Sequence, residues 1–186
     1  TAHGYHPLSW GYLVGEIARR LSPRGQSLGA RLAQTMTNTD GSGEMDMVDF
    51  WIGLPASEHH RCAEISRPKN LPDLGEINDA TRAAFLTPWS AAKRGGAIWR
   101  EIEIPSANGH GTAAGIAALY DAYAHGGAVS GTPWMYAPAF DALTRSRVDG
   151  PDLVLNMSTR FGAGIMPNTH GLFGPKPDTC WHFALG

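Results

Sequence analysis

Serine and lysine stand three residues apart at two places in this 186-residue chain, Ser66 with Lys69 and Ser90 with Lys93. Residues three apart share one face of a helix, so a lysine amine at this spacing can reach the serine hydroxyl. A serine hydroxyl is a weak nucleophile until a neighbouring base takes its proton, and such a pair would supply both groups. Pro68 disfavours a regular helix at Ser66. Only Ser90 and Lys93 are therefore a physically possible pair, and chance spacing is the alternative.

A second place for chemistry is Asn108–Gly111, which we predict to be a glycine-flanked loop entering a helix. Backbone N–H groups at the start of a helix are free to bind anionic or carbonyl groups. We therefore expect Asn108 and His110 to border a substrate cleft. The alternative is a tight connection whose glycines only permit the turn.

Tyr5 precedes the most clearly patterned helix of the chain. The apolar residues that follow it recur at helical spacing and form one stripe, namely Trp10, Leu13, Val14, Ile17 and Leu21. We expect this stripe to belong to the core. Ser9 can cap the helix and Pro7 pre-sets a helix-compatible backbone near its start. Tyr5 is then left in a turn, where it can face a cleft.

The other elements follow from caps, breaks and apolar runs. We expect a helix over 28–36, a strand over 50–54, a helix ending near Phe85, a helix over 113–125 and a last strand over 181–185. Ser27 and Thr112 are suitable N-caps for two of these helices. The isoleucines over 98–104 share parity, which favours an extended segment, and a helical start over 98–101 is the alternative.

Four segments carry a resemblance to a known family. They are YHPLSWGYLVGEIARRL at 5–21, DFWIGLP at 49–55, IPSANGHGTAAGIAALYDAYAHGG at 104–127 and FGPKPDTCWHFALG at 173–186. In this order they resemble segments of serine β-lactamase-like hydrolases, above all the esterases and peptidases related to class C β-lactamases. The resemblance implies an α+β fold of the β-lactamase and DD-peptidase kind. The chain would hold mainly its helical region with part of the antiparallel sheet, as one partial domain over 1–186.

The resemblance also implies roles for single residues. In that family a serine of a Ser-x-x-Lys motif attacks a carbonyl, a tyrosine of a second motif relays protons, and a Lys/His-x-Gly motif lines the site. Tyr5 matches the tyrosine, His182 and Ala184 match the third motif, and the N–H of Leu185 would donate to the oxyanion. Ala184 replaces a glycine, so its methyl group can crowd an acyl group. Pro7 stands where β-lactamases proper carry asparagine, which favours an esterase-like site.

Composition limits the remaining function classes. The formal net charge is −2 and no basic cluster occurs, so neither nucleic acid nor an anionic membrane is an expected partner. No apolar run approaches the ~20 residues that span a bilayer, so we expect a soluble chain. Cys62 and Cys180 do not settle the compartment, and the cytoplasm is slightly favoured. The histidines lack the spacing of a metal site, and no cofactor is implied.

The resemblance therefore implies an interior segment of a serine hydrolase, carboxylesterase-like and working through an acyl-serine intermediate. The family places its nucleophile before the tyrosine, so we expect this chain to be inactive alone. Its substrate would be a small-molecule ester or amide, and a complementary chain would carry the nucleophile. The alternative is a catalytically dead relative, or a helical module that acts as a binding protein.

Overall fold

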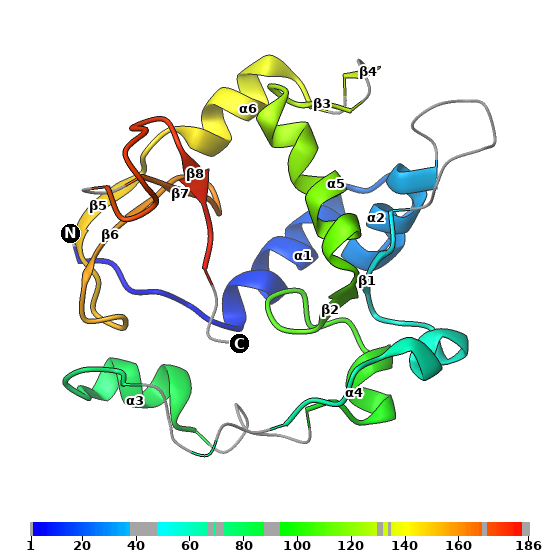
Figure 1. Ribbon diagram of the computed structural model, residues 1–186, viewed down its shortest axis with the longest axis horizontal. Coiled ribbons are helices and arrows are strands. Elements are labelled where there is room, and N and C mark those ends of the chain that lie inside the picture. Colours follow the sequence, from blue (N-terminus) through cyan, green and yellow to red (C-terminus); the bar gives the residue numbers. More distant parts are fainter. Residues whose placement is uncertain are drawn as a thin grey trace.

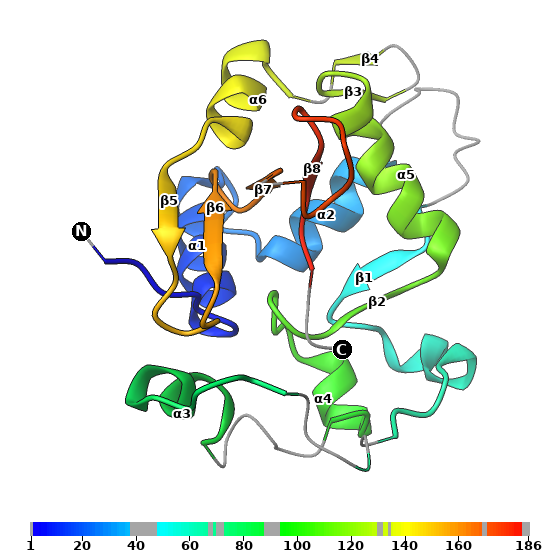
Figure 2. The ribbon, with the colours of Figure 1, turned by 60° about the vertical axis from the view of Figure 1, so that its left-hand side comes forward.

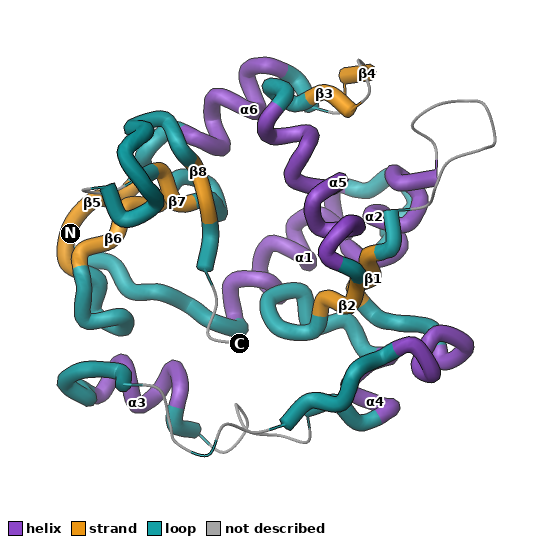
Figure 3. The backbone as a smooth tube through the Cα atoms, viewed as in Figure 1, coloured by secondary structure: helices purple, strands orange, loops and turns teal. Residues whose placement is uncertain are grey.

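The computed structural model describes residues 2–37, 48–66, 69, 73–87, 94–129, 132–133, 135–168 and 171–183. The helices are α1 (Ser9–Leu21), α2 (Leu28–Thr37), the 3-10 helix η1 (Ala56–Arg61), α3 (Asp79–Phe85), α4 (Ala97–Glu101), α5 (Ala113–Ala124) and α6 (Ala137–Thr144). The strands are β1 (Phe50–Ile52), β2 (Gly109–Gly111), β3 (Ala128–Val129), β4 (Thr132–Pro133), β5 (Val148–Pro151), β6 (Ser158–Phe161), β7 (Met166–Pro167) and β8 (Cys180–Trp181). Within the described ranges each strand pairs antiparallel with one other, as β1–β2, β3–β4, β5–β6 and β7–β8 (Figure 3).

Helix α1 confirms the helix predicted after Tyr5. Ser9 is its first helical residue, not its cap, because Leu8 holds the N-cap position and makes no side-chain cap bond. The helix approaches the rest of the chain through Gly11, whose amide donates to Ser106 Oγ at 2.9 Å. A side chain at Gly11 would collide with that hydroxyl and with the Ser106 amide. The glycine therefore allows the close contact that fixes α1.

The apolar stripe of α1 is exposed, which contradicts the prediction that it belongs to the core. Leu13 is 61% exposed, Ile17 58% and Leu21 75%. Among the described residues the buried apolar side chains are instead Leu54, Ala122, Val154, Ile165 and Met166. Helical spacing correctly identified a helix with one apolar face. It carries no information about which segment covers that face.

The segment 109–111 forms a strand and not the predicted loop. It pairs with β1, so that Trp51 lies opposite His110. Gly111 allows a close approach to the backbone, because a Cβ there would collide with the carbonyl oxygen of Asp49, directly before β1. A Cβ at Gly109 would lie 2.5 Å from Cζ of Phe50, at the end of that side chain. Close approach between two backbones is a common reason for glycine within a strand.

Several other predictions are confirmed. Helices α3 and α5 and strand β1 lie within the expected segments, and α2 ends one residue beyond its expected end. Strand β8 shares only Trp181 with the strand expected over 181–185, because residues 182–183 are not in a strand and the rest of that segment lies outside the described residues. Thr112 caps α5 by accepting from the Gly115 amide at 3.0 Å, and Ser27 accepts from the Ala30 amide at 3.2 Å. The segment Ala97–Glu101 is helical, so the alternative to an extended segment was correct. Among the described helices, none has the length and apolar character that crossing a membrane requires.

The first residues of the chain run as an arm beside the β5–β6 hairpin before they enter α1 (Figures 1 and 2). His3 forms a parallel bridge with Asp152, and the Leu153 amide donates to the His3 carbonyl at 2.9 Å. The hairpin itself pairs from Val148 with Phe161 to Pro151 with Ser158. This attachment places Tyr5 between the hairpin and the start of α1.

Candidate active site

Tyr5 and His182, from opposite ends of the chain, meet in one aromatic cluster. The Tyr5 ring lies 6.0 Å from the His182 ring, centroid to centroid, at 43°. Phe161 completes the cluster, with its ring stacked on Tyr5 at 6.0 Å and 18° and lying 6.1 Å from His182. The structure thus brings together the two residues to which the resemblance assigned the second and third motifs. Phe161 was not predicted, since its sequence context shows only an aromatic residue in a strand.

Three separate elements position this cluster. Tyr5 is held in the N-terminal arm by its amide, which donates to Asp152 Oδ1 at 3.1 Å. Phe161 ends strand β6, and its carbonyl accepts from the Arg147 amide at 2.7 Å. His182 directly follows β8, which is paired with β7 through Met166 opposite Trp181. Each ring therefore stands on a backbone that hydrogen bonds hold in place.

The electrostatics of the cluster favour neutral forms of both polar side chains. Burial raises the pKa of the Tyr5 phenol above its ordinary value, and the negative charge of Asp152 raises it further. Burial also lowers the pKa of His182, although a backbone hydrogen bond at Phe183 opposes this shift. Desolvation disfavours whichever form is charged, so both shifts have the same physical origin. At neutral pH the cluster thus presents a phenolic donor beside an uncharged imidazole, a pair suited to giving and receiving protons.

Asn108 lies outside this cluster and has a different environment from the predicted one. Its side chain is fully buried, so the expected contact with substrate does not fit its position. It accepts from the Ile104 amide at 2.8 Å and donates to the carbonyls of Trp99 at 2.7 Å and Ile102 at 2.5 Å. These bonds hold the connection between α4 and β2. We therefore assign Asn108 a role in the local fold.

His110 belongs to the same neighbourhood as Asn108. Its Nδ1 lies 2.7 Å from the Asn108 carbonyl, and its ring meets Trp99 edge-on at 5.4 Å. Burial is the main cause that lowers the pKa of His110. Within the described part of the chain, neither a hydrogen bond nor a ring contact links His110 to Tyr5 or His182. Its predicted place at the border of a cleft stays a prediction.

The other predicted residues divide into two groups. Ser66 is exposed and lies in irregular structure, which agrees with the expectation that no regular helix forms there. Ala184 and Leu185, the predicted third-motif alanine and oxyanion donor, lie outside the described residues, as do Ser90 and Lys93.

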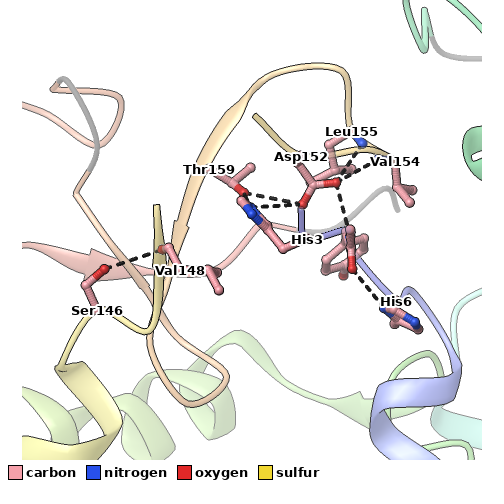
Figure 4. A network of polar contacts seen from close by, with 10 residues as sticks. His3, His6, Ser146, Val148, Asp152, Val154, Leu155 and Thr159 are labelled. Carbon is pink, nitrogen blue, oxygen red and sulfur yellow. Dashed lines mark hydrogen bonds and ion pairs between the residues drawn. The ribbon is translucent and has the colours of Figure 1, made fainter. Parts of the chain in front are cut away.

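Sequence reasoning missed a buried polar group behind Tyr5, formed by Asp152, Thr159 and His3 (Figure 4). Asp152 is 4% exposed and Thr159 is fully buried. The one signal available was an aspartate standing at the head of the apolar run Leu153–Leu155, where a charged residue needs partners if it is buried. The sequence does not indicate that one of these partners is the amide of Tyr5.

The sequence of this chain matches a known protein family. A family model described as beta-lactamase matches residues 1–182. The Esterase/beta-lactamase LipL of Mycobacterium tuberculosis is 30% identical over 198 residues, which cover 98% of this chain and 43% of that protein.

Among the solved structures that are similar over 98% of the chain, two share more than a third of its residues. One is a penicillin-binding protein homologue from Caulobacter crescentus, with a TM-score of 0.85, 44% identity and 47% of its own chain covered. The other is a family VIII carboxylesterase, with a TM-score of 0.77, 36% identity and 47% covered. The predicted α+β fold of the β-lactamase kind is thereby confirmed. The chain spans less than half the length of each of these relatives.

Proposed function

Because this chain belongs to the beta-lactamase family, we propose that it forms part of the active site of a carboxylesterase-like serine hydrolase that works through an acyl-serine intermediate. The observation that carries the proposal is the contact between Tyr5 and His182, the two motif residues, within one cluster. The names of two relatives, an esterase/beta-lactamase and a carboxylesterase, support an ester substrate. Pro7, which replaces the asparagine of β-lactamases proper, supports the same substrate class.

In this proposal Tyr5 relays a proton during acylation. The serine oxygen forms a bond to the ester carbonyl carbon, and the bond to the leaving alcohol breaks. The Tyr5 hydroxyl gives its proton to the leaving oxygen and regains one from the serine hydroxyl, so the tyrosine ends as it began. A phenol that stays protonated at neutral pH, as the raised pKa of Tyr5 implies, is suited to the donating step.

His182 has a supporting part in the same proposal. As a neutral imidazole with a lowered pKa, it adds no positive charge beside the phenol and leaves a nitrogen free to orient substrate. The oxyanion donor at Leu185 and the crowding methyl group of Ala184 remain predictions from the sequence. His110 remains a predicted border residue.

We further propose that the nucleophile comes from polypeptide outside these 186 residues, as a complementary chain or segment. Both Ser-x-x-Lys pairs of the sequence follow Tyr5, whereas the family pattern places the serine before it. The exposed apolar stripe of α1 supports this proposal, because it offers a surface for such a segment. The 186-residue chain alone would then be inactive.

The test is to compare the chain alone with a chimera. In the chimera, these 186 residues replace the matching half of the Caulobacter homologue, which is 44% identical. A fluorophosphonate probe should label the chimera at a serine of the half that the Caulobacter homologue retains, and it should leave the 186-residue chain alone unlabelled. The chimera should also hydrolyse p-nitrophenyl esters. Labelling of the chain alone, mapped to Ser90, would place the nucleophile within this sequence. A folded chimera without ester turnover would favour a binding role.

A further inference from the structure

The carboxylate of Asp152 connects the β5–β6 hairpin to the backbone of Tyr5. Oδ1 accepts three backbone amides, those of Val154 at 2.8 Å, Leu155 at 3.0 Å and Tyr5 at 3.1 Å. The first two are local, and they account for an aspartate that caps its own turn. The third comes from the other end of the chain. Turn formation alone does not require it.

The second carboxylate oxygen is also occupied. Oδ2 accepts the Thr159 hydroxyl at 3.3 Å, and that hydroxyl lies 2.9 Å from His3 Nε2. His3 Nε2 itself stands 3.8 Å from Oδ2. Figure 4 shows the carboxylate between Thr159 and His3 on one side and the backbone at 154–155 on the other. The Asp152 side chain has no exposed surface, and within the described part of the chain its carboxylate is hydrogen-bonded to Thr159 and to the three amides, with His3 beside it.

The same hairpin also holds the ring of Tyr5. Phe161, which stacks on Tyr5, ends strand β6, while Asp152 directly follows strand β5. The hairpin thus fixes the tyrosine at two points, its amide and its ring. Two fixed points restrict both the position and the direction of the hydroxyl, and proton relay depends on both.

We propose that Asp152 is the positioning residue of Tyr5, holding its backbone so that the phenolic hydroxyl points to the reacting atoms. The proposal rests on the proposed function of Tyr5 as the proton relay. Asp152 acts through Tyr5 and takes no part in the bond changes. His3 and Thr159 support the carboxylate from the side opposite the amides.

The charge of Asp152 supplies a readout that a merely structural role would not give. Its negative charge is one cause of the raised pKa of Tyr5. The ring of His182 lies 6.0 Å from the Tyr5 ring, and His3 Nε2 lies 2.9 Å from the Thr159 hydroxyl on the far side of the carboxylate. Removing the charge at 152 should therefore lower the pKa of Tyr5 even where the fold is retained.

The experiment compares three variants of the 186-residue chain. Asp152→Ala removes both the hydrogen bonds and the charge, whereas Asp152→Asn removes the charge and keeps an oxygen that can accept the Tyr5 amide. Asp149→Asn is the matched control, because Asp149 lies on the same hairpin and pairs with Arg160 at 2.7 Å. The readouts are hydrogen exchange at the Tyr5 amide and NMR titration of ¹³Cζ-labelled tyrosine, with Tyr5→Phe to assign the resonance. Ester turnover of the same variants in the chimera gives kcat and KM.

In Asp152→Ala we expect the hydrogen-exchange protection of the Tyr5 amide to fall by at least about 10-fold. In Asp152→Asn we expect the pKa of the Tyr5 phenol to be lower than in the parent. In the chimera, Asp152→Ala should lower kcat by about 10- to 100-fold with KM changed less than about 3-fold. Asp149→Asn should change none of these.

A folded Asp152→Ala protein that keeps the parent's protection at the Tyr5 amide and the parent's kcat would overturn the proposal. If Asp152→Ala does not fold, Asp152→Asn decides by titration: an unchanged phenol pKa would show that the carboxylate does not act on Tyr5 and would overturn the proposal. If the chimera stayed active with the Tyr5→Phe substitution, the proposed function of Tyr5 would be refuted instead. Hydrogen exchange at the Tyr5 amide and titration of its phenol would still report whether Asp152 holds Tyr5.

Discussion

Asn108→Leu tests whether Asn108 serves the local fold or the substrate. Leucine has a similar shape but cannot hydrogen bond, so three backbone groups lose a partner, the Ile104 N–H and the carbonyls of Trp99 and Ile102. A buried polar group left unpaired costs about 1–3 kcal/mol. The segment between α4 and β2 can relax in part, which makes the total smaller than three full penalties. We therefore expect the free energy of unfolding to fall by about 3–6 kcal/mol. Domains of this size have about 5–15 kcal/mol in total.

The assay is urea unfolding followed by tryptophan fluorescence, with the free energy extrapolated to water. Ser57→Ala is the control, because Ser57 is exposed and should change stability by no more than about 0.5 kcal/mol. Stability within about 1 kcal/mol of the parent for Asn108→Leu would refute the assignment. If the same variant kept its stability but weakened substrate binding in the chimera, Asn108 would be assigned to the substrate site.

Four further predictions follow from burial, capping, charge and chemistry. Leu13→Ala should lower the free energy of unfolding of the chain alone by less than about 1 kcal/mol, because the Leu13 side chain is largely exposed. Met166 is only 1% exposed, so Met166→Ala should lower it by about 2–5 kcal/mol in the same urea assay. Thr112→Ala should lose about 1 kcal/mol through the missing cap of α5, with a matching fall in the helical circular dichroism signal on heating. His182 has its pKa lowered by burial, so it binds its proton more weakly folded than unfolded, and stability should fall as pH drops below 6.5 and through the folded pKa. His182→Gln should flatten that part of the pH profile, and an unchanged profile would remove His182 as its cause. Tyr5→Phe should leave the unfolding midpoint nearly unchanged, because its ring still stacks on Phe161.

Local chemistry made the helices predictable from the sequence. Thr112, a predicted N-cap, accepts an amide within the first turn of α5 at 3.0 Å, and the structure shows Asn78 doing the same for α3 at 2.9 Å, so the effect of each cap is set by neighbours in sequence. The apolar spacing that follows Tyr5 likewise identified α1. Burial of that stripe was predicted wrongly, because burial depends on other segments and not on the period of the helix itself.

The unpredicted features depend on contacts between distant segments. Strand β2 was taken for a loop because glycine favours turns, whereas in the fold Gly109 faces the ring of Phe50 on the paired strand, and a Cβ there would lie 2.5 Å from it. The pairing of Tyr5 with His182 was available only through the resemblance, since no local pattern links the two ends of the chain. Asp152 was missed for the same reason: its bond to the Tyr5 amide is visible only in the fold.

The most direct test of the central claim is the acylation rate of the chimera with Tyr5→Phe. Tyr12→Phe is the matched control, because Tyr12 is another tyrosine of the same region and is 52% exposed on α1. Single-turnover kinetics with a p-nitrophenyl ester separate acylation from product release. If Tyr5 relays the proton, Tyr5→Phe should lower the acylation rate by about 100-fold or more, and Tyr12→Phe should leave it within about 2-fold. An acylation rate that survives Tyr5→Phe within a few-fold would contradict the account.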